Sequence, residues 1–146
     1  MPRNAVAYDD DFYAWTQEQA RLLRDGEFAS LDVENVVEEL ESMGKSVRRE
    51  LRNRLALVIM HLLKWQHQPI LRSGSWSGTI REQRKQVRDL LDESPSLAAV
   101  IKDGLGSIYV SARRKASSET GFAETMFPAA CPFTPEQVLD EAFLPE

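Results

Sequence analysis

Glutamates gathered in one short stretch are the first residues of this sequence whose type and spacing could do chemistry. In "ENVVEELE", Glu34, Glu38 and Glu41 follow at spacings of four and three, which would place them on one side of a helix. Carboxylates with an imidazole can bind a divalent metal ion or transfer protons. The candidates for a catalytic site are therefore Glu38, Glu39, Glu41 and His61, with Glu38 and His61 as candidate metal ligands. The alternative is a solvated or salt-bridged helix face.

Both histidines of the chain lie in the stretch "HLLKWQHQP", directly after the apolar run "LALVIM". His61 and His67 are six residues apart, about 240° around a helix, so they cannot bind one ion on a straight helix. His61 is either part of a reactive site or a hydrogen-bonded residue of the core. If a glutamate of the acidic helix packs against His61, we expect its pKa to be raised.

A basic stripe on a later helix could contact phosphate. Its residues recur at i, i+3, i+4 and i+7 and are Arg81, Arg84, Lys85 and Arg88. Trp76 precedes the stripe, and an aromatic ring beside basic residues is typical of sites that bind single-stranded nucleic acid. Trp65 is the other aromatic candidate contact. The alternatives are that the stripe pairs with the acidic helices and that both tryptophans anchor the core.

The charge of the chain is segregated along the sequence. The net charge is −5, but residues 1–45 carry 4 Lys/Arg and 11 Asp/Glu, residues 46–115 carry 14 and 6, and the last 31 residues carry none and 6. Such segregation is typical of a basic segment that binds nucleic acid, or of acidic and basic helices that pair with each other. Acidic segments would compete with nucleic acid for the basic one, so nucleic acid is not the partner we expect.

Several reaction and cofactor classes lack their motifs here. With one cysteine and two histidines, the chain has no Cys-x-x-Cys, no His-Glu-x-x-His and no Glu-x-x-His. It also has no Gly-rich phosphate loop and no Gly-x-Ser-x-Gly elbow. We therefore expect no cofactor, and the residues alone do not decide whether the protein is an enzyme.

Helices must position these side chains, because apolar residues recur at spacings of three and four along nearly the whole chain. Gly26 and Gly44 are expected to stop helices, and Pro69 must follow the end of another. Ser94 with Pro95, and Thr134 with Pro135, are typical of helix starts. The pattern predicts helices over residues 9–26, 32–44, 46–68, 79–94 and 95–121 and a short helix over 134–143.

The expected organisation is an all-α, single-domain bundle of about five helices over residues 1–146. Residues 1–8 would form a flexible N-terminus, and residues 122–146 an irregular C-terminal extension, with the short terminal helix, packed on the bundle. The N-terminus has no apolar signal-peptide core, and no apolar run is long enough to span a membrane. The lone Cys131 fits a reducing compartment. We expect a cytoplasmic protein that contacts no membrane.

Five ordered motifs give this sequence a specific likeness to a known family. From about Tyr8 to Glu146, "DFYAW", "ENVVEELESMGKS", "HLLKWQHQP", "SWSGTIREQR" and "CPFTPEQVLDEAFLPE" resemble the bacterial family called domain of unknown function 29. The resemblance implies an all-helical soluble bacterial protein and supplies no reaction, cofactor or substrate. Val33 departs from the family pattern, in which an aromatic residue is expected. The candidates that fall in family motifs are the second-helix carboxylates, His61, Trp65, Trp76, Arg81 and Arg84.

The function that the sequence favours is a non-enzymatic protein-interaction or regulatory module, with a protein partner or a second copy of itself. No complete catalytic constellation is present, and segregated charge suits helix pairing. The first alternative is a metal-binding protein or enzyme that uses the carboxylates and His61. It requires these side chains to converge in a concave pocket. The second alternative is phosphate or nucleic-acid contact through the basic stripe, with an affinity that falls steeply with salt.

Overall fold

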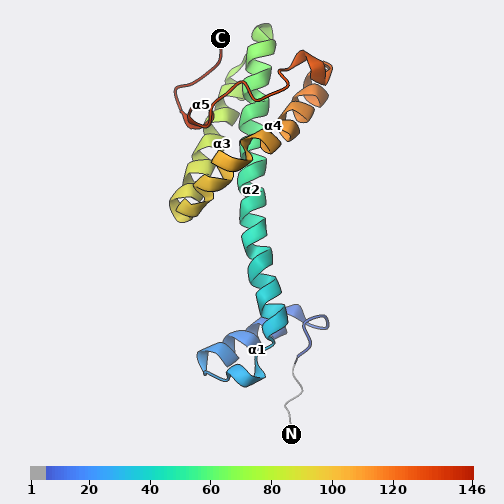
Figure 1. The fold of residues 1–146 in the computed structure, drawn as a ribbon, viewed down its shortest axis with the longest axis vertical. Coiled ribbons are helices and arrows are strands. Elements are labelled where there is room, and N and C mark those ends of the chain that lie inside the picture. The colour runs from blue at the N-terminus through green and yellow to red at the C-terminus, as the bar shows by residue number, and fades with distance from the viewer. Residues whose placement is uncertain (1–5) are drawn as a thin grey trace. The chain divides into compact units, whose positions relative to one another are not determined.

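Helices make up the regular structure of residues 6–146, the part of the chain that this computed structural model describes (Figure 1). The α-helices are α1 (Phe12–Arg24), α2 (Val33–His67), α3 (Gly74–Glu93), α4 (Ala98–Thr120) and α5 (Pro135–Leu139). No strand occurs in this range. The predicted all-α fold, with about five helices and a short terminal one, is therefore confirmed. Residues 1–5, on which most of the predicted flexible N-terminus falls, lie outside the described residues.

Two compact units divide the chain, and each is described by itself. Unit 1 comprises the described residues up to Ser46, and unit 2 comprises Val47–Glu146. In unit 1, Asp11 caps α1 by accepting a hydrogen bond from the Ala14 backbone N–H at 3.0 Å. Gly26, at a φ of 71°, follows the end of α1 as the sequence predicts.

Unit 1 has a small core that ties α1 to the start of α2. Its buried side chains are Trp15, Gln19 and Leu22. The Trp15 indole N–H donates to the Asp32 carboxylate at 3.0 Å, and the Gln19 side-chain oxygen accepts from the Asp32 backbone N–H at 2.8 Å. Phe12 and Leu23, which the apolar spacing places on the same face, stay 50% and 46% exposed.

One continuous helix, α2, replaces the two helices that the sequence predicts on either side of Gly44. The described glycines with positive φ are Gly26 and Gly121, so Gly44 keeps ordinary helical geometry. Glycine in a helix interior costs about 1 kcal/mol relative to alanine, which weakens a helix without ending it. The helix does end at His67, before Pro69, as predicted. None of the helices in the described residues combines the length and apolar composition needed to cross a membrane.

Unit 2 contains the larger core, in which α3 and α4 lie against the last part of α2 (Figure 1). Apolar residues all round this part of α2 are buried, as the run "LALVIM" predicts. The most completely buried of them are Leu51, Leu55, Ile59, Leu62 and Leu63. Helix α3 contributes Ile80 and Val87, and α4 contributes Ile108 and Tyr109.

The C-terminal segment, residues 122–146, belongs to the same core. Three of its side chains are buried there: Phe127, Phe133 and Val138. Thr134 and Gln137 form a reciprocal capping box at the start of α5, with Pro135 at the first helical position, as the sequence predicts. The Tyr109 hydroxyl donates to the Pro128 carbonyl, which fixes the segment further on α4.

Candidate functional site

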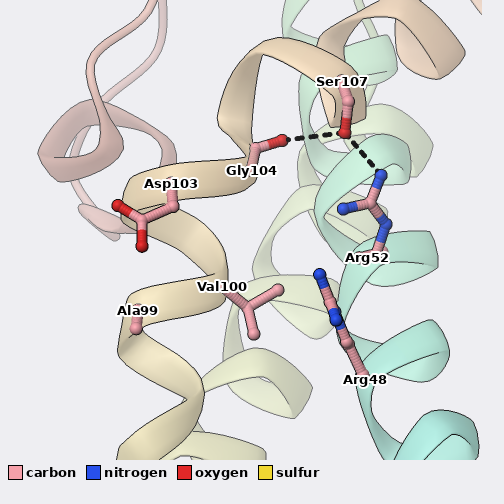
Figure 2. Close-up of a pocket in the computed structure, with 7 residues that line it drawn as sticks. All are labelled: Arg48, Arg52, Ala99, Val100, Asp103, Gly104 and Ser107. Carbon is pink, nitrogen blue, oxygen red and sulfur yellow. Dashed lines mark hydrogen bonds between the residues drawn. The ribbon is translucent and has the colours of Figure 1, made fainter.

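A shallow pocket in unit 2 lies between α2 and α4 (Figure 2). Its volume is about 370 Å³. Helix α2 supplies Arg48 and Arg52, and α4 supplies Ala99, Val100, Asp103, Gly104 and Ser107. The two arginines are one helical turn apart, so both reach into the pocket from the same face of α2. We call this site the Arg48–Arg52 pocket.

The Arg48–Arg52 pocket carries positive charge that no described carboxylate neutralises. Arg52 donates to the Ser107 hydroxyl at 2.6 Å, and that hydroxyl donates to the Gly104 carbonyl at 3.3 Å. Neither arginine belongs to an ion pair among the described residues. Figure 2 shows the Asp103 carboxylate turned away from both guanidinium groups. Such a pocket suits an anionic group, because guanidinium groups bind carboxylate and phosphate with paired hydrogen bonds.

Gly104 faces the Arg52 guanidinium at short range. A Cβ at position 104 would lie 3.2 Å from Nη1 of Arg52, which would force the guanidinium to shift. Gly104 therefore lies at a close contact between α2 and α4. Arg48 and Arg52 are absent from the sequence candidates. Their spacing of four residues was the available signal, but nothing in the sequence joins them to Gly104.

The glutamates of α2 in unit 1 are of two kinds. Glu39 is half-buried and accepts a hydrogen bond from the Tyr8 hydroxyl, which is the main reason that the pKa of Tyr8 is raised to about 12. Glu34, Glu38 and Glu41 are exposed. They form no ion pair among the described residues. Glu39 therefore has a structural contact, while the other three remain available to a partner.

His61 is half-buried in unit 2 and bonded to its own helix. Its Nδ1 lies 2.9 Å from the Leu57 carbonyl oxygen. A carbonyl can only accept, so Nδ1 carries the proton and Nε2 keeps a free lone pair. Burial lowers the pKa of His61, and the positive charge of Lys64 lowers it further, while the Leu57 carbonyl and Glu119 act in the opposite direction. The raised pKa that a glutamate contact would cause is therefore not found, since burial outweighs Glu119.

The tryptophans of the candidate set lie beside cations of unit 2. Lys64, only 8% exposed, lies 4.6 Å from the centre of the Trp76 ring and 3.3 Å from the Glu119 carboxylate. The Arg72 guanidinium lies 5.2 Å from the Trp65 ring. Both rings are half-buried, and each contributes a cation–π contact within the fold.

The predicted basic stripe does not form one exposed face. Arg84 is 2% exposed, whereas Arg81, Lys85 and Arg88 are exposed. Lys85 pairs with Asp89 at 3.0 Å, and Arg88 pairs with a glutamate of the C-terminal segment. Two of the three exposed cations are thus already neutralised within unit 2.

Arg84 instead holds the C-terminal segment from inside the core. Its Nε donates to the Val138 carbonyl at 2.8 Å, Nη1 to the Phe143 carbonyl at 2.9 Å, and Nη2 to the Gln137 carbonyl at 3.1 Å. Two of these carbonyls belong to the end of α5, where backbone oxygens lack helical partners. Burial lowers the pKa of Arg84, and the nearby acidic residues of the segment oppose that shift.

No group of three or more His, Cys, Asp and Glu side chains is arranged to hold a metal ion within residues 6–146. The metal-ligand role of Glu38 and His61 stays a prediction. The contacts found for His61 come from unit 2, and the contact found for the carboxylate cluster comes from Tyr8 in unit 1.

Lowering the pH should destabilise unit 2 through His61. Because burial lowers its pKa in the folded protein, the unfolded chain takes up a proton first as the pH falls below the ordinary value of 6.5. The free energy of unfolding should fall from there down to the folded pKa and then level off. His61→Gln should remove this part of the decrease. Urea unfolding of both proteins at neutral and mildly acidic pH measures it.

His67→Gln is the matched control for the loss of an imidazole. The His67 Nδ1 contacts the Leu63 carbonyl at 3.0 Å, so both histidines have the same kind of backbone bond. An equal pH dependence in the wild-type protein and in His61→Gln would contradict the prediction.

A family model described as "Domain of unknown function DUF29" matches residues 7–144, which confirms the resemblance carried by the five motifs. No curated protein matches the chain, and no solved structure matches it.

Proposed function

We propose a function for this chain, which belongs to the DUF29 family, from its exposed side chains: it is a helical module that binds a protein partner. The observation that carries the proposal is a row of apolar residues on α2 in unit 1. Val33, Val37, Leu40 and Met43 are 55%, 45%, 63% and 63% exposed. We call this row the apolar face of α2.

The spacing of these residues supports a binding surface. Steps of four, three and three residues place the four side chains along one side of a helix. Isolated exposed apolar residues are common on any protein, but a contiguous row marks a surface that a partner covers. The unpaired Glu34, Glu38 and Glu41 lie along one edge of the row, as charged residues border the cores of protein interfaces.

The other functions considered from the sequence have less support. The described residues offer no cluster of metal-binding side chains, so no observation favours a metal or carboxylate–histidine site. Nucleic-acid contact through the basic stripe is disfavoured, because Arg84 is buried and both Lys85 and Arg88 are paired. The single cysteine supports a cytoplasmic location as part of the proposal.

A photo-cross-linking amino acid at position 40 tests the proposal in the cells that make the protein. Leu40 is largely exposed, so the substitution leaves the fold intact, and we expect a covalent adduct with a protein. Gln66, an exposed polar residue of α2 in unit 2, is the control position and should give none. Equal yields at the two positions, or no adduct at position 40, would contradict the proposed function. The mass of the adduct identifies the partner.

A further inference from the structure

We propose that the Arg48–Arg52 pocket binds glutamates of α2 from a second copy of the chain. The inference rests on the proposed function and names its partner. The site is incomplete in one chain, because it offers two guanidinium groups while its own carboxylate, that of Asp103, is turned away from both (Figure 2). The second copy supplies Glu34 and Glu38, and so completes it.

The described residues contain both cations and carboxylates that belong to no ion pair, and these two sets can bind each other. Arg48 and Arg52 have no ion pair among the described residues, and Arg52 has only the neutral Ser107 hydroxyl as a hydrogen-bond partner there. Glu34 and Glu38 are exposed and equally without an ion pair in residues 6–146. One chain therefore contains both halves of a charge-complementary contact, which is the condition for a two-fold symmetric dimer.

The spacing of the two glutamates also matches the spacing of the two arginines. Glu34 and Glu38 are four residues apart on a helix, and so are Arg48 and Arg52. Each pair therefore presents its charged groups one helical turn apart. When the two segments run in opposite directions, Glu38 lies opposite Arg48 and Glu34 lies opposite Arg52. A parallel alignment would instead place the acidic segments against each other and repel.

The pocket has the shape for such a contact. Its volume of about 370 Å³ accommodates two carboxylate-bearing side chains. The Ser107 hydroxyl holds the Arg52 guanidinium in place, so less side-chain entropy is lost when the carboxylate binds. The apolar face of α2 borders the glutamates, and the same approach would remove it from water.

Charge reversal tests the inference through the dimer dissociation constant, measured by analytical ultracentrifugation over a wide concentration range. Glu38→Arg and Arg48→Glu should each weaken the dimer by about tenfold or more, since each places like charges opposite each other. The double variant, with both reversals, should recover most of the affinity. Raising the salt concentration should weaken the wild-type dimer, because exposed ion pairs are screened.

Arg49→Glu is the matched control, since Arg49 is exposed, adjacent in sequence and absent from the pocket. It makes the same change of charge and should have a smaller effect. All three residue changes concern exposed side chains, and circular dichroism confirms that each variant is folded.

Four results would overturn the inference. A wild-type protein that stays monomeric at every concentration lacks the second copy. A dimer that tolerates Arg48→Glu as well as Arg49→Glu uses another surface. If Glu38→Arg or Arg48→Glu changes the stability of the monomer and leaves the dimer dissociation constant unchanged, the ion pair lies within one chain. If the adduct at position 40 contains a different protein, the proposed function stands and this inference fails.

Discussion

Replacing Arg84 by methionine should lower the free energy of unfolding of unit 2 by about 3–5 kcal/mol. The guanidinium is 2% exposed and donates to three carbonyls of the C-terminal segment. Methionine fills a similar volume but leaves these oxygens without a donor, and each unsatisfied buried acceptor costs about 1–3 kcal/mol. Because the substitution also removes the cost of burying the Arg84 charge, the net decrease in stability is smaller than the sum for the three carbonyls. Urea unfolding measures the total.

Two further variants separate the effect of the three Arg84 hydrogen bonds from the effect of its charge and from that of replacing any arginine of α3. Arg84→Lys keeps the charge, but one ammonium group cannot satisfy three carbonyls in this geometry, so an intermediate loss is expected. Arg81→Met changes an exposed arginine of the same helix and should stay within about 0.5 kcal/mol of the wild type. If Arg84→Met is as stable as Arg81→Met, the three hydrogen bonds do not hold the segment.

Replacing Trp15 by alanine should unfold unit 1 and leave unit 2 folded. Truncating a buried tryptophan costs about 3–5 kcal/mol. In the described part of unit 1, the only other buried apolar residue is Leu22. The substitution also removes the indole hydrogen bond to Asp32 and the ring contacts with Tyr8 and Phe12, at 4.8 and 5.9 Å. With Leu22 as the remaining buried apolar side chain in the described part of unit 1, we expect this loss of stability to unfold the unit.

Hydrogen exchange followed by mass spectrometry measures the effect of Trp15→Ala segment by segment. Peptides from α1 should lose protection, while peptides from α3 and α4 should keep it. Tyr13→Ala, at a side chain that is 73% exposed, is the control and should change neither. Unchanged protection of α1 in Trp15→Ala would contradict the role assigned to this core. The adduct at position 40 should also be lost, because the apolar face of α2 belongs to unit 1.

The ends of most elements were predictable because the signals that set them are local. Gly26 and Pro69 act through backbone atoms only a few residues away, so the sequence identified both boundaries. The start of α3 at Gly74, where the pattern predicts residue 79, is one exception, and the continuous helix through Gly44 is another. The cost of Gly44, about 1 kcal/mol, is smaller than the gain from continuing a hydrogen-bonded helix, and the spacing rule could not weigh the two.

The candidate residues were harder to interpret, since their environments depend on distant parts of the chain. From its position next to an apolar run, His61 could be either part of a reactive site or a hydrogen-bonded residue of the core. The direction of its pKa shift required the balance between burial, Lys64 and Glu119, and Glu119 lies on another helix. Composition could indicate that charge mattered, but it could not indicate which cations would remain unpaired.

The sequence by itself determined the all-α class, the capping of α5 by Thr134, the membership of a family and the segregation of charge. Tertiary structure alone decided that Arg84 is a buried donor to carbonyls 53, 54 and 59 residues away. It alone brought Arg52 to Ser107, 55 residues along the chain, beside Gly104. The physical reason is the same in both cases. Helical spacing determines which side of a helix an arginine occupies, while packing against a distant segment determines whether that side meets water, a carbonyl or a pocket.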